Sequence, residues 1–333
     1  MKNTRTWFTG IATVAIVAAA AAGYGVGAQA ADAPAPAKQV SRPDTAAVYP
    51  DVVETSHASK GAADFLRSFF TAKSQHKVDA TASHFNKQQA AYYDATLGWP
   101  AESYDAVRKI FADAMPNWPK EAKSYPTRII GDTRSAVVLF TDTPELFGGE
   151  VRAIGVLDFE NGKITRWVDY WDSRNFGSEA AAKLRTPAAA FPQSLGENKV
   201  SGHASAAVDR AARKLNDALS RKDAKAAAAL FSDDATFEDM ALRTNIQGRS
   251  AIGRYLQRAL PDLPYGPGAT VRHVVGSNQG GGYEWKADGK AVPRGATALE
   301  LDAQGKITRL TAVWDGSLLS DQVMSSLAAR SID

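Results

Sequence analysis

An aspartate stands between two tryptophans at the end of a strand-like segment in the first half of the chain. The stretch GKITRWVDYWD runs from Gly162 to Asp172. Successive side chains of a strand point to opposite faces, so Trp167, Asp169 and Trp171 share one face. A carboxyl among indoles is poorly solvated, which raises its pKa and its strength as a base. The spacing therefore marks Asp169 as a candidate general base, with Trp167 and Trp171 in the wall around it.

Nearly the same sequence motif occurs a second time, without this aspartate. GKITRLTAVWD runs from Gly305 to Asp315, an offset of 143 residues (305 − 162). In a chain of this length, chance recurrence of GKITR is roughly a two per cent event, so the two halves are predicted to be copies. The face that carries Asp169 is apolar in the second copy, where Ala312 and Trp314 lie. This face is therefore predicted to point inward in both copies.

Two further aspartates lie in acidic-aromatic segments. In TFEDMALR, Phe237 and Asp239 share a face, and in YYDATLGW, Tyr92 shares a face with Asp94. A turn-capping or helix-capping role at a strand end is the alternative for Asp239. Asp94 and Asp169 are expected to border one pocket. Two carboxyls in unequal environments suit acid–base catalysis, and they equally suit recognition of a polar group on an apolar ligand.

Aromatic side chains near these carboxyls are the candidate pocket lining, although most would be core residues in a protein without a ligand. The candidates are Phe69, Trp99, Phe111, Trp167 and Trp171 in the first half, and Phe237 and Trp314 in the second.

The aspartates common to both copies, Asp172 and Asp315, fall on the opposite face of the strand. We expect them beside Arg166 and Arg309, in ion pairs or strand-end caps that serve the structure. A role in the site is the alternative, since a bulge can redirect a side chain.

Helical and strand-like patterns follow the same order in both halves. An apolar stripe at helical spacing opens each half, and a later helix follows Ser103 or Ser250, each placed to act as an N-cap. Three strand-like runs close each half, and Asn161-Gly162 is a typical hairpin turn before the last run of the first half. Helices followed by antiparallel strands predict an α+β fold, with the helices on one face of each sheet.

The chain is long enough for two units with separate cores. We predict a first unit over residues 59–179 and a second over 206–329. Residues 180–205, rich in Pro, Ala, Gly and Ser, are predicted to link them.

The first thirty residues have the composition of a secretory signal peptide. Two cationic residues precede the apolar stretch 11–22, and AQA at 28–30 fits the small-residue cleavage rule. We predict that 1–30 is removed and that the protein is secreted or periplasmic, with no stable membrane anchor afterwards; retention as an anchor is the alternative. A Pro- and Ala-rich tether is predicted for 31–58. The chain contains no cysteine, which excludes disulfides.

A family resemblance follows from the segment ALFSDDATFEDMALRTNIQGRSAIGRYL (229–256), which resembles ketosteroid isomerases. Each unit as a whole looks like the nuclear transport factor 2-like superfamily, which includes the SnoaL-type polyketide cyclases. The resemblance implies two cone-shaped units, each a curved antiparallel sheet with helices packed on its concave face around an apolar pocket. It also implies a catalytic aspartate at Asp169, as in SnoaL-type cyclases, and a proton-shuttling aspartate at Asp239, as in ketosteroid isomerases. The oxyanion donors of those isomerases match Leu215 and about Thr297, neither of which is a strong donor.

Two classes of function fit these observations. In the first, the exported protein binds a small, largely apolar molecule, and Asp169 acts as the base in isomerisation or aldol-type cyclisation of a carbonyl compound, assisted by Asp94 or Tyr92. Epoxide opening by paired acids is a variant. In the second, the protein is a non-catalytic module that binds a ligand or another protein.

No cofactor is required by this chemistry, and no metal is expected because the five histidines form no helical pair with metal-ligand spacing. The net charge of +3, without a basic-aromatic run, gives no reason to expect a nucleic-acid partner. The sheet faces are expected to pair the units as an intramolecular pseudo-dimer, or to pair two copies as a homodimer.

Overall fold

The computed structural model describes residues 53–332. The predicted signal peptide, 1–30, and most of the predicted tether, 31–58, lie outside the described residues. The end of that tether is not a free connector, because Glu54 bridges Arg128 and Ala58 bridges Gly131 at an edge of the first sheet.

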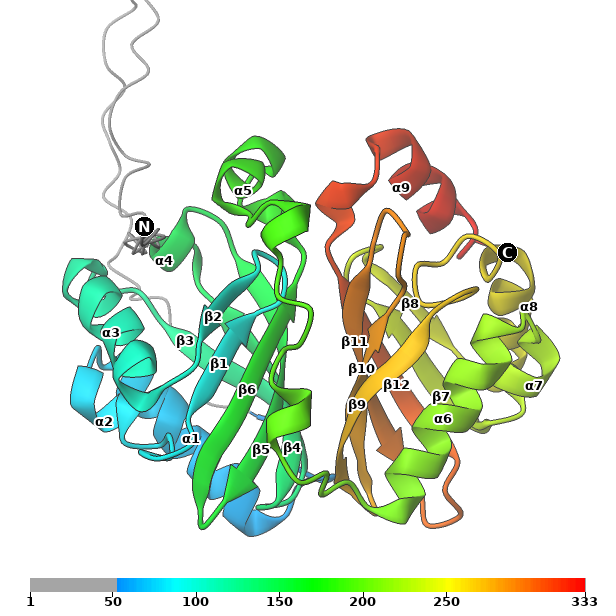
Figure 1. Ribbon diagram of the computed structural model, residues 1–333. Coiled ribbons are helices and arrows are strands. Elements are labelled where there is room, and N and C mark those ends of the chain that lie inside the picture. Colours follow the sequence, from blue (N-terminus) through cyan, green and yellow to red (C-terminus); the bar gives the residue numbers. More distant parts are fainter. Residues whose placement is uncertain (1–52, 333) are drawn as a thin grey trace, which may run out of the picture.

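Two units with the same order of elements follow one another along the chain (Figure 1). The first comprises α1 (Lys60–Ser74), α2 (Val78–Ala82), β1 (Ala91–Asp94), β2 (Trp99–Ala101), α3 (Tyr104–Ala114), η1 (Met115–Asn117), β3 (Ser124–Gly131), β4 (Ser135–Asp142), α4 (Pro144–Phe147), β5 (Val151–Glu160), β6 (Lys163–Trp171) and η2 (Ser173–Asn175). The segment between the units contains α5 (Ser178–Leu184), η3 (Ala188–Ala190) and η4 (Glu197–Lys199). The second unit comprises α6 (Ala206–Ser220), α7 (Ala224–Ala228), β7 (Phe231–Asp239), β8 (Thr244–Gln247), α8 (Arg249–Ala259), β9 (Thr270–Ser277), β10 (Gly280–Lys286), β11 (Arg294–Leu301), β12 (Ile307–Trp314), η5 (Gly316–Leu318) and α9 (Asp321–Ala329).

Each unit contains one six-stranded sheet, in the order β2-β1-β6-β5-β4-β3 or β8-β7-β12-β11-β10-β9. The predicted α+β class with two units is confirmed. The sheets are mixed rather than wholly antiparallel, because β1 runs parallel to β6 and β7 runs parallel to β12. This pairing sets Asp94 opposite Asp169 in the first sheet and Asp239 opposite Ala312 in the second.

The sequence prediction did not separate β3 from β4, and it missed β10 and the short strands β2 and β8. The first run of the first unit is a hairpin, since β3 and β4 pair antiparallel around a turn at residues 132–134. In the second unit β10 begins with three consecutive glycines, which weaken the strand pattern in the sequence. The Asn161-Gly162 turn is confirmed, with positive φ at both residues (52° and 69°), as a two-residue hairpin requires.

The helices cover one face of each sheet (Figure 1). In α1 the residues Leu66, Phe69 and Phe70 are buried and pack toward β4 and β6. Ser103 accepts a hydrogen bond from the amide of Ala106 at 3.1 Å and caps α3 as predicted. The prediction for Ser250 was wrong: α8 begins at Arg249, with a glycine in the N-cap position.

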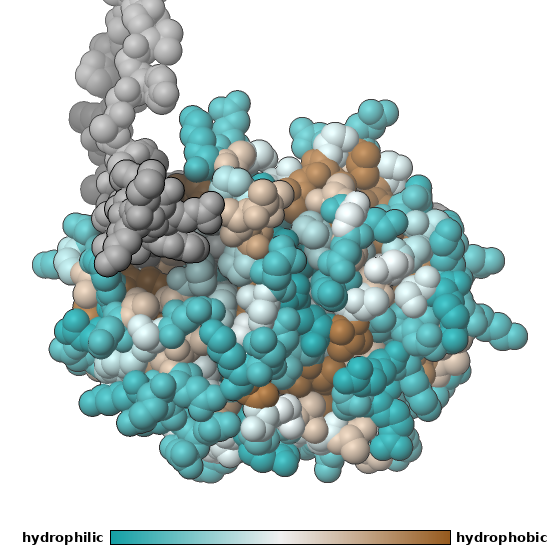
Figure 2. Space-filling model, viewed as in Figure 1, coloured by the Kyte–Doolittle hydropathy of each residue, from teal (hydrophilic) through white to brown (hydrophobic). Residues whose placement is uncertain are grey.

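The opposite faces of the two sheets pack against each other in the middle of the molecule (Figure 1). This layer is apolar, with Ile130, Val137, Ile154, Val156 and Val168 from the first sheet and Val275, Ala296, Ala298 and Val313 from the second. Gly280 and Gly282 allow the close approach, because a Cβ at either would lie 3.0 or 2.8 Å from a methyl group of the first sheet. On the face seen in Figure 2 the surface is mainly hydrophilic, which agrees with burial of the apolar residues in these layers.

A buried ionic cluster lies within this layer. The fully buried guanidinium of Arg166 lies 2.6 Å from Glu284 and 3.5 Å from Asp158. Tyr170 donates a hydrogen bond to Glu284 at 2.8 Å, and His273 lies 2.9 Å from Asp158. Because the cluster joins side chains of both sheets, it fixes their relative position.

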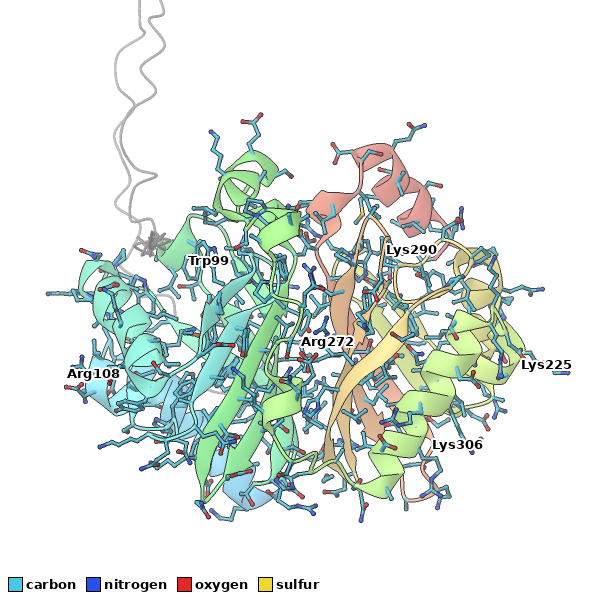
Figure 3. The ribbon with its side chains drawn as sticks, in the orientation of Figure 1. Trp99, Arg108, Lys225, Arg272, Lys290 and Lys306 are labelled. Carbon is cyan, nitrogen blue, oxygen red and sulfur yellow. The ribbon has the colours of Figure 1, made fainter. Side chains whose placement is uncertain are left out.

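The segment between the units packs along the same layer. Arg272, which Figure 3 shows between the two sheets, donates to Glu197 at 2.8 Å and to the carbonyl of Gln193 at 3.1 Å. The carbonyl of Leu195 accepts a hydrogen bond from Arg166 at 2.7 Å. Residues 180–205 therefore contribute to the structure of both units.

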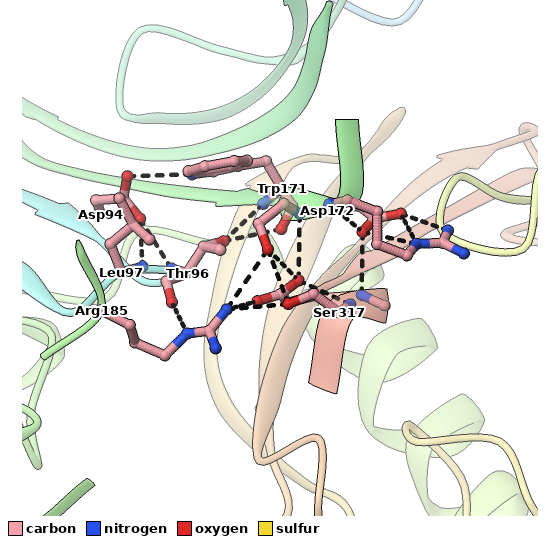
Figure 4. A network of polar contacts seen from close by, with 11 residues as sticks. Asp94, Thr96, Leu97, Trp171, Asp172, Arg185 and Ser317 are labelled. Carbon is pink, nitrogen blue, oxygen red and sulfur yellow. Dashed lines mark hydrogen bonds and ion pairs between the residues drawn. The ribbon is translucent and has the colours of Figure 1, made fainter. Parts of the chain in front are cut away.

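The aspartates shared by the two copies cap turns across the boundary between the units (Figure 4). Asp172 accepts a hydrogen bond from the amide of Gly316, and Asp315 accepts one from the amide of Ser173, each at 3.2 Å. Each aspartate also caps its own turn, η2 or η5. Such a reciprocal contact is typical of a two-fold interface.

The predicted structural role of these aspartates is confirmed, but their predicted partners were wrong. Asp172 pairs with Arg174, and Asp315 pairs with Arg185. Arg166 belongs to the ionic cluster, and Arg309 lies 3.9 Å from Glu300.

Candidate functional site

A cavity of about 520 Å³ lies inside the first unit, between its sheet and α1 and α3. All five aromatic residues predicted for the first half line it, namely Phe69, Trp99, Phe111, Trp167 and Trp171. Figure 3 places Trp99 at the upper end of the first unit, where its indole donates to the carbonyl of Leu184 in α5 at 3.0 Å. The segment between the units thus contributes to the wall of this cavity.

Asp169 lies on β6 in this wall, with only 8% of its surface exposed. Tyr92 of β1 donates a hydrogen bond to its Oδ2 at 2.9 Å, and the indole of Trp167 donates to its Oδ1. Strand alternation thus places the carboxyl among the aromatic residues that the sequence indicated.

The contact between Trp167 and Asp169 depends on a glycine in the neighbouring strand. Gly155 of β5 is the ladder partner of Asp169. A Cβ at Gly155 would lie 2.9 Å from the indole nitrogen of Trp167. The missing side chain therefore leaves the space in which the indole reaches the carboxylate.

Burial raises the pKa of Asp169 from 3.8 to about 7. The hydrogen bonds from Trp167 and Tyr92 and the charge of Lys73 oppose this shift, but removal of the carboxylate from water dominates. Near neutral pH this carboxyl exchanges readily between its acidic and basic forms, as a proton-transfer group requires.

Asp94 also lines the cavity, but most of its hydrogen-bonding capacity serves the turn after β1. Its Oδ1 accepts from the amides of Thr96 (2.9 Å) and Leu97 (2.8 Å), and its Oδ2 accepts from the indole of Trp171 at 3.1 Å (Figure 4). Burial raises the pKa of Asp94 to about 6, against the effect of these donors.

A lysine–aspartate pair in the same cavity was absent from the sequence prediction. Lys73 of α1 lies 3.0 Å from Asp142 at the end of β4, and both side chains are largely buried. Lys73 follows Phe69 and Phe70 on the buried stripe of α1, so helical spacing was a signal that could have found it. Nothing in the sequence near Asp142 indicated its position.

The residues predicted as a site in the second unit are buried in its hydrophobic core. Asp239 is fully buried, and burial raises its pKa to about 6. Its oxygens accept hydrogen bonds from the amide of Leu242 (2.9 Å), the indole of Trp314 (3.1 Å) and the hydroxyl of Tyr265 (2.8 Å). Phe237 and Trp314 belong to the same packed core.

Ladder partners show which residues of the two units correspond. In the first unit Trp171 pairs with Ala153, and Ala153 pairs with Phe140. In the second unit Trp314 pairs with Gly295, and Gly295 pairs with Trp285. Gly295 therefore corresponds to Ala153, and Trp285 corresponds to Phe140. The larger indole of Trp285 packs against Gly295, where a side chain would collide with it. The pocket found in the second unit is lined by residues of 261–267, 290–292 and 319–330 and does not include Asp239.

Comparison with known proteins identifies the family of the second unit. Residues 212–310 match the SnoaL-like domain family. The second unit is a SnoaL-like domain. The first unit repeats its strand order, with the same parallel pairing of the first and last strands of the sheet, and is a further copy of the fold.

Solved structures also match parts of this chain. A provisionally assigned ketosteroid isomerase from Kribbella flavida is 16% identical; the match covers 44% of this chain and 93% of that one, with a TM-score of 0.30. An NTF2-like protein of unknown function from Burkholderia pseudomallei is 18% identical; the match covers 39% of this chain and 100% of that one, with a TM-score of 0.29. An NTF2-like protein of unknown function from Cytophaga hutchinsonii is 14% identical; the match covers 38% of this chain and 96% of that one, with a TM-score of 0.29. Values this low carry no information about activity. No curated protein matches the chain significantly.

The second unit differs from the ketosteroid isomerase pattern at the oxyanion positions. Leu215 is buried and apolar, and the buried hydroxyl of Thr297 has no hydrogen-bond partner among the described residues. In the first unit Gly155 occupies the register of Thr297, because each faces the corresponding position of the last strand. Lys73 is therefore the buried cationic donor available in the first cavity.

Two other features, a metal site and a membrane-spanning helix, are considered for residues 53–332. Within this range no group of three or more His, Cys, Asp or Glu side chains is arranged to hold a metal ion. None of the helices in this range is both long and apolar enough to cross a membrane.

Proposed function

We propose that the first SnoaL-like unit binds a small, largely apolar carbonyl compound in its cavity and that Asp169 moves a proton at a carbon beside the carbonyl. One observation carries this proposal. A buried carboxyl with a pKa of about 7 lines an aromatic cavity, while its counterpart in the second unit is Ala312. The second SnoaL-like unit is proposed to support the first structurally.

The ionised form of Asp169 would take a proton from the carbon next to the carbonyl, and the electron pair of the C–H bond would move into an enolate. When the carbon that loses the proton also bears a C=C bond, the anion is a dienolate, and return of the proton from Asp169 to its γ-carbon shifts the double bond and completes an isomerisation. Attack of the enolate carbon on a second carbonyl of the same molecule forms a C–C bond and an alkoxide, and the proton on Asp169 then neutralises the alkoxide. Neither route consumes an oxidant or a reductant.

The remaining polar side chains of the cavity have distinct roles in this proposal. Tyr92 and Trp167 hold the carboxylate of Asp169 in one orientation through their hydrogen bonds. Lys73 lines the same cavity, and its charge lowers the pKa of Asp169; in this proposal its ammonium stabilises the enolate oxygen. Asp142 keeps the ammonium of Lys73 in the cavity wall.

The proposal is tested by exchange of the α-hydrogens of 2-tetralone for deuterium, followed by NMR in D₂O. The wild-type protein is expected to accelerate exchange, and Asp169→Asn is expected to reduce the acceleration by about 10²–10⁴-fold. Asp79→Asn, the same chemical change at an exposed position in α2, serves as the control and should exchange like wild type. Equal acceleration by wild type and Asp169→Asn would refute the role of Asp169.

Non-catalytic ligand binding is a second candidate, and the hydrogen bonds of Asp94 favour it. Three donors already hold this carboxylate, so it suits recognition of a polar group on a ligand better than proton transfer. The same observation weighs against epoxide opening by paired acids. Binding of 2-tetralone without accelerated exchange would favour this candidate.

We also propose that the protein acts outside the cytoplasm, as a secreted or periplasmic protein. The support is the order of cationic residues, apolar stretch and AQA motif within residues 1–30. The mass of the protein recovered from the producing cell tests this, since cleavage after Ala30 predicts a chain beginning at Ala31, and an intact N-terminus would contradict it.

A further inference from the structure

Asp94 and Asp239 hold the same position in the two SnoaL-like units. Each is the last residue of its strand and lies opposite the corresponding residue of the neighbouring parallel strand, Asp169 or Ala312. Each accepts a hydrogen bond from the backbone amide three residues later, at 2.8 or 2.9 Å. Each also accepts one from the tryptophan that ends the last strand, at 3.1 Å in both units.

One donor distinguishes the two carboxylates. In the second unit the hydroxyl of Tyr265 donates to Asp239 Oδ2 at 2.8 Å, in addition to the indole of Trp314. In the first unit Asp94 Oδ2 accepts a hydrogen bond from the indole of Trp171 and none from a tyrosine hydroxyl. A carboxylate oxygen accepts about two hydrogen bonds, so Asp94 Oδ2 has capacity for one more.

The first unit contains a cavity beside this carboxylate. Asp94 and Trp171 both line it, although Asp94 is only 8% exposed. Tyr265 reaches Asp239 from the loop after α8. The loop after α3 instead provides Trp118, which lines the cavity, packs against His76 and makes no hydrogen bond to Asp94.

The walls around this position are aromatic in both units. The ring of Tyr265 lies 6.1 Å from that of Trp285. The residue in the register of Trp285 is Phe140, which lines the cavity of the first unit. The second unit therefore shows, with its own side chain, a phenol bound between an aromatic wall and a carboxylate.

We infer that the ligand of the first unit carries a hydroxyl on a flat, unsaturated ring and that this hydroxyl donates a hydrogen bond to Asp94 Oδ2, as the Tyr265 hydroxyl does to Asp239. This inference rests on the proposed function, and it names the ligand class as hydroxy-aromatic or enolic molecules. Asp94 is a binding residue in this account, whereas Asp169 transfers the proton.

Binding of two naphthalenes of similar shape tests the inference. 2-Naphthol can donate a hydrogen bond and 2-methoxynaphthalene cannot, and fluorescence titration gives both dissociation constants. We expect the full chain to bind 2-naphthol about tenfold or more tightly than the ether. Asp169→Asn is expected to keep this preference, and Asp94→Asn is expected to reduce it to about twofold or less. A crystal structure of the complex should place the naphthol oxygen within hydrogen-bond distance of Asp94 Oδ2.

Equal binding of the two naphthalenes would overturn the inference and leave the proposed cavity function intact. Absence of binding by both would overturn the proposed function together with the inference. A naphthol oxygen on Asp169 instead of Asp94 would also overturn the inference.

A second variant covers the case in which Asp94→Asn does not fold. Tyr265→Ala removes the phenol from the second unit and leaves Asp239 beside the vacated space. It is expected to gain a second site for p-cresol, in addition to the cavity of the first unit, with binding of toluene at the new site at least about tenfold weaker. Equal binding of p-cresol and toluene at that site would contradict the role assigned to the hydroxyl.

Discussion

The carboxyl of Asp169 is the residue that most clearly separates the two units. It lies in the register of Ala312. Of the two flanking tryptophans, Trp171 corresponds to Trp314, whereas Trp167 corresponds to Leu310. Burial raises its pKa to about 7, so the folded protein holds this proton more tightly than the unfolded chain does. The stability of the protein must therefore depend on the ionisation of this residue.

The sign of this dependence follows from the raised pKa. The stabilising effect is complete below the unfolded value of 3.8 and is lost as the pH rises through about 7. Asp169→Asn removes this titration and leaves those of Asp94 and Asp239 in place. We predict that the free energy of unfolding of the variant, relative to wild type, rises by about 4 kcal/mol between pH 4 and pH 8.

Urea unfolding at several pH values measures this difference. Asp79→Asn should show a constant offset from wild type, because Asp79 is exposed. A constant offset for Asp169→Asn as well would show that its carboxyl titrates normally in the folded protein.

At the scale of the element, the arrangement of side chains on the inner face of β6 depends on the neighbouring strand, β5. Gly155 of β5 leaves room for the indole of Trp167, which in turn holds Asp169. The site is therefore a property of two paired strands, and a methyl group on the neighbouring strand is enough to disturb it.

Gly155→Ala tests this dependence. The new Cβ would lie 2.9 Å from the indole nitrogen of Trp167 and 3.1 Å from Val138, so the indole must move away from the carboxylate. We predict a loss of about 1–3 kcal/mol in the free energy of unfolding, measured by urea unfolding. Gly202→Ala is the matched control and should be nearly neutral, since a Cβ there meets nothing within 4 Å. Equal stability of the two variants would show that the indole has room to shift.

The sequence allowed prediction of the elements whose pattern is local. Alternation along β6 indicated that Asp169 shares a face with Trp167, and the N-cap of α3 followed from Ser103. The strand β10 could not be predicted, because its glycines are required by contact with the other sheet. Tyr265 lies in a Pro- and Gly-rich loop without periodicity, so its contact with Asp239 depends on tertiary packing alone.

At the scale of the whole molecule, the two units form a two-fold-like pair within one chain. The reciprocal caps of Asp172 and Asp315 explain why both copies of the repeated motif end in aspartate. The cluster around Arg166 adds buried charges to this layer, with carboxylates from both sheets. Removal of its cation would leave Glu284 buried without an ion-pair partner and Asp158 buried beside His273 alone.

Arg166→Met tests the importance of this layer. We predict a loss of about 3–5 kcal/mol in the free energy of unfolding at pH 7, because the two carboxylates remain out of water. Arg152→Met removes a cation from an exposed ion pair of the same unit and should change the stability by less than about 0.5 kcal/mol. Similar small effects of the two substitutions in urea unfolding would mean that the layer is held by apolar packing alone.

One unit with a cavity and one with a filled interior suggest a division of work between a ligand-binding half and a supporting half. The pH profile of α-hydrogen exchange in 2-tetralone tests this account most directly. For wild type we predict a rate that rises with pH and levels off above an apparent pKa of about 7, as Asp169 ionises. The same rise should be absent in Asp169→Asn. A wild-type rate without an inflection near this pH, or an unchanged profile in the variant, would contradict the account.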